Sequence, residues 1–214
     1  MSHLVYVGGR KGGCGKTTTA LMLCLGAILR GQPSTYVLTD PVKELKPEGR
    51  PFGVIDGRDP ASLAQIIANN AKVLNGWLIV DGGGNRPAFD AEMARLSDLC
   101  LLPFADDEEM TDCVRMDLAA IPHALAWPVN WPTNKMAATS AQRHIDELAQ
   151  DFPLRLLAPP IFEVRSSKEL LGKSLENPST AVRSAARRAF EIMADRFDEI
   201  THGKAPQPQL AAVG

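Results

Sequence analysis

Lys11 to Thr18, with the sequence KGGCGKTT, is the stretch that decides the fold of this 214-residue chain. It lies between a short apolar run, His3 to Val7, and a longer one, Ala20 to Leu29. The short run ends at two glycines, as a buried strand does where it meets a turn, and the longer run has the length of a helix. The predicted order is therefore strand, glycine loop and helix, an arrangement that binds phosphate groups at the start of the helix.

The loop itself has the composition of a phosphate-binding site. Its glycines let successive backbone N–H groups point inward, toward an anion at the positive end of the following helix. Lys16 can then reach the β- and γ-phosphates of a nucleotide, and the hydroxyl of Thr17 can coordinate Mg²⁺. We therefore expect a nucleoside triphosphate site. The residues expected to bind the nucleotide are Gly12, Gly13, Cys14, Gly15, Lys16, Thr17 and Thr18.

A second lysine, Lys11, lies within the loop, and Arg10 stands where the ordinary P-loop pattern has glycine. A cation beside the phosphates can stabilise the charge that spreads over a transferred phosphoryl group. The alternative is a solvated loop charge with no role in the chemistry. Lys11 is therefore a candidate catalytic residue.

Acidic residues follow two further predicted strands. The strand Thr35 to Thr39 is followed by Asp40, and the strand Trp77 to Val80 ends at Asp81. Ligands of a parallel sheet lie beyond the carboxyl ends of its strands, and carboxylate oxygens are preferred ligands of Mg²⁺. We expect Asp81 to hold Mg²⁺ and Asp40 to contact the metal or a water molecule. A turn built on Asp40-Pro41 is the alternative for the second of these acids.

Strand-like and helix-like segments alternate along the rest of the chain. Further strands are expected at Leu99 to Phe104, Ala126 to Val129 and Leu154 to Leu157. Helices are expected at Ala61 to Leu74, Pro87 to Leu96, Asp107 to Ala120, Ala137 to Gln150, Ser166 to Leu171 and Pro178 to Ile200, the last with Asn177-Pro178 as its cap and first turn. This alternation predicts an α/β fold with a mainly parallel sheet flanked by helices. We expect a single P-loop ATPase domain over residues 1–200 and a flexible tail over residues 201–214.

Composition and charge exclude several classes of protein. A formal net charge of −2 gives the whole chain no attraction for nucleic acid, so DNA binding would need a local basic patch. No apolar run approaches the roughly 20 residues that span a bilayer, which predicts a cytoplasmic protein. The cysteines form no CxxC pair or zinc-site spacing, so we expect reduced thiols at Cys14, Cys24, Cys100 and Cys113.

The stretch from Lys11 to Thr18 resembles the deviant Walker A motif of the ParA/MinD family of dimeric ATPases. The resemblance implies a SIMIBI-type P-loop fold, hydrolysis of ATP with Mg²⁺, and a homodimer in which Lys11 crosses to the partner's nucleotide. It also implies that Asp40 positions the attacking water. The implied catalytic residues are Lys11, Lys16 and Asp40, and the implied metal contacts are Thr17, Asp40 and Asp81.

Two further segments compare with this family. Leu38 to Val42 is similar to its second motif, but Leu38 replaces an aspartate and Val42 a glutamine, which leaves room for very slow hydrolysis. Residues 82–85, GGGN, resemble the switch of short plasmid ParA proteins of the ParF kind, and three glycines give such a segment freedom to move. A plain turn is the alternative for residues 82–85.

The resemblance also suggests how adenine is recognised. Asn130 is the best candidate for the asparagine that the family places after its fifth strand, and residues 159–162 would then pack against the base. The alternative is that Asn130-Trp131-Pro132 forms nothing more than a turn.

ParA-like proteins close into nucleotide-sandwich dimers that coat DNA non-specifically, and a small ParB-like partner stimulates hydrolysis to release them. The resemblance therefore implies partition or positioning of a plasmid, chromosome or other cargo, and nucleoid association in the ATP-bound state. The candidate DNA contacts are Arg165, Lys168, Lys173, Arg183, Arg187 and Arg188. Acids interspersed among them make an ordinary solvated helix face the alternative. Membrane binding of the MinD kind is not expected, since residues 201–214 form no amphipathic helix pattern.

Other functions of the same superfamily stay open. A metabolic P-loop enzyme, such as a synthetase that phosphorylates a small carboxylate, would share the loop without requiring Lys11. A conjugation-related or other cargo-positioning ATPase would use the same ATP switch. An iron–sulfur carrier ATPase is disfavoured because the chain has no CxxC pair to hold a shared cluster.

Overall fold

The computed structural model describes residues 2–70, 72 and 75–202 and contains a six-stranded parallel sheet. The strand order is β3-β2-β4-β1-β5-β6. The strands are β1 (Ser2–Val7), β2 (Ser34–Leu38), β3 (Gly53–Asp56), β4 (Gly76–Asp81), β5 (Leu99–Phe104) and β6 (Ala124–Pro128). Asp81 in β4 is in register with both Val7 of β1 and Leu38 of β2, so the carboxyl ends of these strands lie together.

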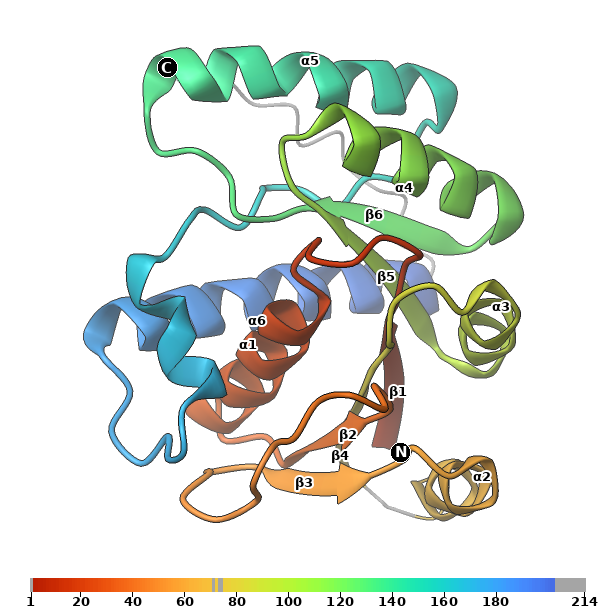
Figure 1. The fold of residues 1–214 in the computed structure, drawn as a ribbon, viewed down its shortest axis with the longest axis vertical. Coiled ribbons are helices and arrows are strands. Elements are labelled where there is room, and N and C mark those ends of the chain that lie inside the picture. The colour runs from red at the N-terminus through yellow and green to blue at the C-terminus, as the bar shows by residue number, and fades with distance from the viewer. Residues whose placement is uncertain (1, 71, 73–74, 203–214) are drawn as a thin grey trace.

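Helices cover both faces of the sheet (Figure 1). Residues alternate along each strand between the two faces, so Val5 and Val7 join one hydrophobic cluster and Leu4 and Tyr6 the other. The first cluster contains α1 (Lys16–Leu29) and α6 (Thr180–Thr201), which lie side by side. The second contains α2 (Pro60–Asn70), α3 (Pro87–Leu96), α4 (Glu108–Ala120) and α5 (Lys135–Asp151).

The contact between α1 and α6 requires a glycine. A Cβ atom built on Gly26 of α1 would lie 2.2 Å from the carbonyl oxygen of Ala186 in α6. Trp77 of β4 packs edge-on against Phe190 and Phe197 of the same helix. The C-terminal helix therefore covers the helix that follows the glycine loop and fixes its position on the sheet.

The structure corrects the predicted strands at two places. The strand predicted at residues 154–157 is wrong: only an isolated bridge joins Leu156 to Ala126, and Leu154 has a left-handed φ of 68° that interrupts an extended chain. The strand β3 was not predicted, because its four residues are mostly exposed and one of them is glycine. β3 is an edge strand, and such strands lack the continuous apolar run by which the buried strands were found.

Some helix boundaries also differ from the sequence interpretation. The segment predicted as a helix at Ser166 to Leu171 is a 3₁₀ helix, η1 (Arg165–Leu171). The predicted cap at Asn177-Pro178 is wrong, because Ser179 caps α6 by accepting a hydrogen bond from the backbone N–H of Val182. The helix predicted to end at Leu74 is described up to Asn70, and residues 71, 73 and 74 lie outside the described residues. The predicted tail lies outside them from residue 203 onward.

Candidate functional site

The glycine loop joins the carboxyl end of β1 to the first turn of α1 (Figure 1). Gly13 and Gly15 have left-handed φ values of 78° and 95°, which favour glycine. A Cβ atom on Gly15 would also lie 2.9 Å from Cγ2 of Val129. Because no side chain of the described residues caps the start of α1, its first N–H groups remain available to an anion. The loop therefore has the backbone geometry of a phosphate site.

The ammonium group of Lys16 is buried within this loop. Its Nζ donates a hydrogen bond of 2.6 Å to the carbonyl oxygen of Lys11 and lies 3.5 Å from Sγ of Cys14. Only 6% of the residue is exposed. A buried cation whose partners are neutral attracts an anion strongly, and the β- and γ-phosphates of a nucleotide would satisfy it.

The ammonium group of Lys11, in contrast, is held by α4. It pairs with the carboxylate of Glu109, which is largely exposed, and this hydrogen bond raises the pKa of Lys11. About a third of the Lys11 side chain is exposed. The structure therefore places the two loop lysines in different environments, with Lys16 buried in the loop and Lys11 on the surface.

Arg10, the departure from the ordinary P-loop pattern, has a structural partner that the sequence did not reveal. Its backbone N–H donates to Oδ2 of Asp117 at 3.0 Å, and its Nε donates to Oδ1 at 2.6 Å. Asp117 lies on α4 and is only 6% exposed. This two-pronged contact fixes the start of the loop to the helix that also holds Lys11.

Asp81 lies at the end of β4 and is fully buried. The hydroxyl of Tyr36 donates a 2.6 Å hydrogen bond to its Oδ2, while Oδ1 has no partner among the described residues. Burial raises the pKa of Asp81, although the hydrogen bond from Tyr36 and the nearby hydroxyl of Thr17 lower it in part. A buried carboxylate oxygen without a partner suits a metal ion or its bound water.

Asp40 follows β2 and lies at the same end of the sheet as Asp81. Its Oδ1 accepts a 3.0 Å hydrogen bond from the backbone N–H of Val42, so the turn considered as the alternative for Asp40-Pro41 is present. Its Oδ2 lies 3.5 Å from Nζ of Lys43, and that same ammonium contacts the hydroxyl of Thr17. The sequence analysis did not single out Lys43.

The residues present fit Mg²⁺. The hydroxyl of Thr17, the carboxylate of Asp40 and the partnerless Oδ1 of Asp81 are oxygen donors, and they converge on one end of the sheet. The two departures from the second family motif lie outside this group: Leu38 is buried in the core and Val42 is 89% exposed. When bound, Mg²⁺ would neutralise phosphate charge beside Lys16.

A cavity of about 180 Å³ adjoins the glycine loop. Gly13, Cys14, Gly15 and Thr18 line one side of it, and Asn130 with residues 161–162 lines the other. The structure thus brings Asn130 and part of the segment 159–162 to the loop, as the adenine prediction requires. The role of Asn130 in binding a base stays a prediction.

Two of the three glycines at 82–84 have close neighbours in the structure. A Cβ atom on Gly82 would lie 2.4 Å from the hydroxyl of Tyr6, and one on Gly83 would lie 2.8 Å from the guanidinium of Arg86. The following Asn85 has a left-handed φ of 58° and donates its backbone N–H to the carbonyl oxygen of Arg10 at 3.0 Å. The switch prediction remains untested, while the close approaches alone explain two of the glycines.

A buried polar network lies beneath this segment. The hydroxyl of Tyr6 is hydrogen bonded to Oδ1 of Asp90, and burial raises the pKa of Asp90. Arg86 donates a 2.8 Å hydrogen bond to the hydroxyl of Thr39, which in turn donates to the carbonyl oxygen of Asp81 at 2.7 Å. These contacts tie α3 and the segment after β4 to the carboxyl ends of β1 and β2.

The six basic residues proposed from the sequence lie in or beside η1 and α6, and all are exposed. None forms an ion pair within residues 2–70, 72 and 75–202. Two of the acids among them are bound to other groups. Glu169 accepts a hydrogen bond from the backbone N–H of Ser179 at 2.8 Å, and Glu191 forms an ion pair with Arg30 at 3.2 Å. The basic side chains are therefore available to an external anion.

The four cysteines are free thiols, and three of them are buried. Burial raises the pKa of Cys24 and of Cys100, which makes these two thiols less ionised than an exposed thiol at neutral pH. Among the helices that the structure describes, none combines the length and the apolar character needed to cross a membrane.

Solved structures share this fold at low sequence identity. Apo McdA of Cyanothece is 15% identical, with 88% of this chain and 99% of that chain covered and a TM-score of 0.63. The septum site-determining protein MinD of Pyrococcus horikoshii OT3, complexed with Mg-ADP, is 18% identical over 97% and 100%, with a TM-score of 0.63. Cobyrinic acid a,c-diamide synthase from Mycobacterium smegmatis, with bound ADP and magnesium, is 16% identical over 98% and 100%, with a TM-score of 0.63.

The fold prediction is confirmed, since the parallel sheet flanked by helices matches SIMIBI-type P-loop NTPase structures. Neither a protein-family model nor a curated protein matches the chain. The matched structures include a septum site-determining protein and a synthase, so the shared fold does not by itself select one activity.

Proposed function

We propose that this protein is a ParA-like ATPase that closes into a sandwich dimer around two molecules of ATP. The observation that supports the proposal best is the different placement of the two loop lysines. Lys16 supplies a buried positive charge within its own loop, whereas Lys11 is held at the surface by the exposed Glu109. A surface lysine on a phosphate loop can reach a nucleotide across an interface once it leaves Glu109.

In this proposal each residue of the site has a defined role. Lys16 and the amides of residues 12–18 hold the phosphates, and Lys11 reaches the nucleotide of the partner subunit. Thr17 and Asp81 hold Mg²⁺, and Asp40 lies near the metal and positions the attacking water. The cavity beside Asn130 receives the base.

The output of the cycle is DNA binding and cargo movement. Dimer formation would join two copies of the exposed basic surface, which supports non-specific contact with phosphates and association with the nucleoid. A small ParB-like partner would stimulate slow hydrolysis and release the DNA, so that plasmid, chromosome or other cargo is partitioned or positioned. A conjugation-related ATPase would use the same cycle with a different cargo.

A small-molecule synthetase is the second candidate. The cobyrinic acid a,c-diamide synthase structure covers as much of this chain as any of the structures described above. An enzyme of that class has no need of Lys11 at a second nucleotide, so the dependence of dimerisation on Lys11 separates the two functions.

Light scattering tests the proposal. With ATP and Mg²⁺, the slow-hydrolysis variant Asp40→Ala is expected to show twice the mass of one chain, and Lys11→Ala with the same nucleotide is expected to remain a monomer. A monomer in both the wild type and Asp40→Ala would contradict the sandwich dimer, and dimerisation of Lys11→Ala would contradict the role of that lysine.

A further inference from the structure

The ammonium group of Lys43 lies where the proposed function needs a metal ion. It contacts the hydroxyl of Thr17 and lies 3.5 Å from Oδ2 of Asp40. Both of these contacts of Lys43 are therefore with residues that fit Mg²⁺.

Lys43 and Mg²⁺ cannot use these groups together. The ammonium group donates to one of the two lone pairs of the Thr17 hydroxyl oxygen, and a metal ion bound to the other lone pair would lie next to that ammonium group. Two cations that share one small group of acids also repel each other at such short range. Binding of the metal must therefore move the ammonium group away.

We infer that Lys43 is a built-in cation that neutralises the metal site of the nucleotide-free protein and must be displaced when a Mg²⁺-nucleotide binds. This inference rests on the proposed nucleotide function. Lys43 then has two effects: it compensates the charge of Asp40 without metal, and it weakens the binding of a divalent ion to the nucleotide-loaded protein.

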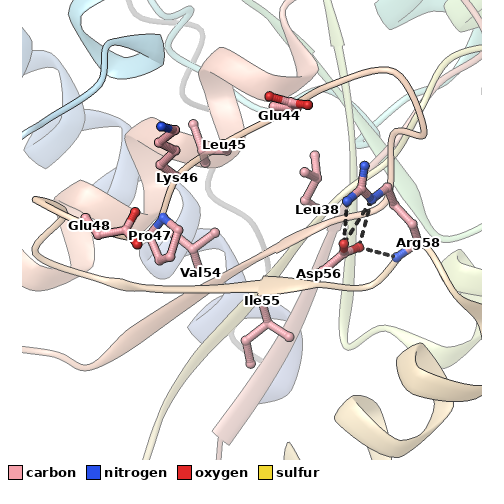
Figure 2. Close-up of a pocket in the computed structure, with 10 residues that line it drawn as sticks. All are labelled: Leu38, Glu44, Leu45, Lys46, Pro47, Glu48, Val54, Ile55, Asp56 and Arg58. Carbon is pink, nitrogen blue, oxygen red and sulfur yellow. Dashed lines mark hydrogen bonds and ion pairs between the residues drawn. The ribbon is translucent and has the colours of Figure 1, made fainter.

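The surroundings of Lys43 permit this movement. Its side chain is 42% exposed, so the ammonium group can reach water without passing through the core. The residues that follow it, Glu44 to Glu48, border a cavity of about 420 Å³ whose other side is formed by Leu38, by residues 54–56 and by Arg58 (Figure 2). Free space beneath this segment gives the backbone near Lys43 room to shift.

The far end of the same segment is fixed. Arg50 donates from Nη1 to the carbonyl oxygen of Leu170 at 2.9 Å and from Nη2 to that of Gly172 at 2.7 Å. The backbone N–H of Leu175 donates to the carbonyl oxygen of Gly49 at 2.7 Å. The displacement of Lys43 is therefore confined to the part of the segment nearest the metal site.

Titration of Mn²⁺ in the presence of ADP, followed by electron paramagnetic resonance of the free ion, tests the inference without measuring hydrolysis. Lys43→Met and Lys43→Gln should bind Mn²⁺ about fivefold more tightly than the wild type, since removal of one partly exposed ion pair changes affinity by roughly this factor. Lys46→Met is the matched control, because it removes a charge from the same segment and should leave Mn²⁺ affinity unchanged.

Equal or weaker Mn²⁺ binding in both Lys43 variants would overturn the inference and leave the nucleotide function standing. A gain of the same size in Lys46→Met would also overturn it, because the effect would then come from the net charge of the segment. If the wild type and all variants fail to bind ADP in a parallel calorimetric titration, the proposed nucleotide function fails and this inference fails with it.

Discussion

The glycine loop and the basic surface of η1 and α6 are built in opposite ways. In the loop, Lys16 is buried, Arg10 is held by Asp117, and two glycines have backbone angles that other residues rarely adopt. On the basic surface, all six side chains are exposed, and none is ion-paired within the part of the chain that the structure describes. The loop depends on fixed geometry, and the surface depends on charge.

This difference determines how strictly each proposed function depends on particular residues. A phosphate site needs particular residues at particular backbone positions. The backbone angles and the burial of those residues would therefore contradict a phosphate site that had been assigned wrongly. A non-specific DNA surface needs only enough positive charge, and any solvated helix face can supply that. Substitutions in the two regions test this contrast, beginning with the largest expected effect.

Replacing Lys16 tests the claim that the glycine loop depends on fixed geometry. Lys16→Ala should lower ATP affinity by about 100-fold, since it removes a charge-assisted hydrogen bond to phosphate in a buried site. Lys11→Ala is the matched control: it should bind ATP like the wild type and lose dimerisation together with the turnover that depends on dimers. Isothermal titration calorimetry measures both affinities. Equal ATP affinity in the wild type and Lys16→Ala would refute the phosphate role of Lys16.

Neutralising the arginines of α6 tests the claim that the basic surface depends on charge. With ATP bound, Arg183→Gln, Arg187→Gln and Arg188→Gln combined should weaken binding to unrelated duplexes and reduce the salt slope by about 0.9 for each phosphate that is no longer neutralised. Fluorescence anisotropy across a salt series measures this slope. Arg143→Gln, an exposed arginine on α5, is the control. If the wild type binds no DNA at low salt, a protein or small-molecule target replaces DNA in the proposal.

The pH dependence of stability gives the smallest effect and concerns the buried acid of the site. Burial raises the pKa of Asp81 above the unfolded value of 3.8, so its protonated form stabilises the folded, ligand-free protein and this stabilisation is lost as the pH rises through the folded pKa. The melting temperature of the wild type relative to Asp81→Asn should therefore fall as the pH rises above the unfolded value of 3.8, by about 2–4 °C for each kcal/mol of stability lost. Thermal unfolding of both proteins without nucleotide measures this difference in melting temperature. A difference that does not change with pH would contradict burial of Asp81 as its cause.

Much of the site was predictable because its signals are local in the sequence. The glycine loop, the lysine and threonine at the start of α1, and an acid at the end of a buried strand each occupy a few consecutive residues. Hydrophobic runs and their alternation likewise predicted the four inner strands β2, β4, β1 and β5 and the helices around them. Short-range patterns are enough for such features, because secondary structure and phosphate loops are formed within one segment.

Other features depend on residues that are far apart in the sequence. Asp117 meets Arg10 across 107 positions, Asp90 meets Tyr6 across 84, and Lys43 meets Thr17 across 26. The sequence around each of these residues forms no pattern that would identify the distant residue it contacts. The sheet register brings Lys43 to Thr17 by placing the carboxyl ends of β1, β2 and β4 side by side, and the packing of α3 and α4 on the sheet brings Asp90 and Asp117 to their partners.

The sequence alone thus determined that this chain is a parallel α/β protein with a glycine loop between its first strand and its first helix, because hydrophobic period and glycine spacing act within single segments. Only the tertiary structure decided which charges surround that loop. It placed Lys11 against Glu109, Arg10 against Asp117 and the Lys43 ammonium between Thr17 and Asp40. Charge pairing depends on distances across the folded molecule, and these distances are fixed only when the strands and helices pack.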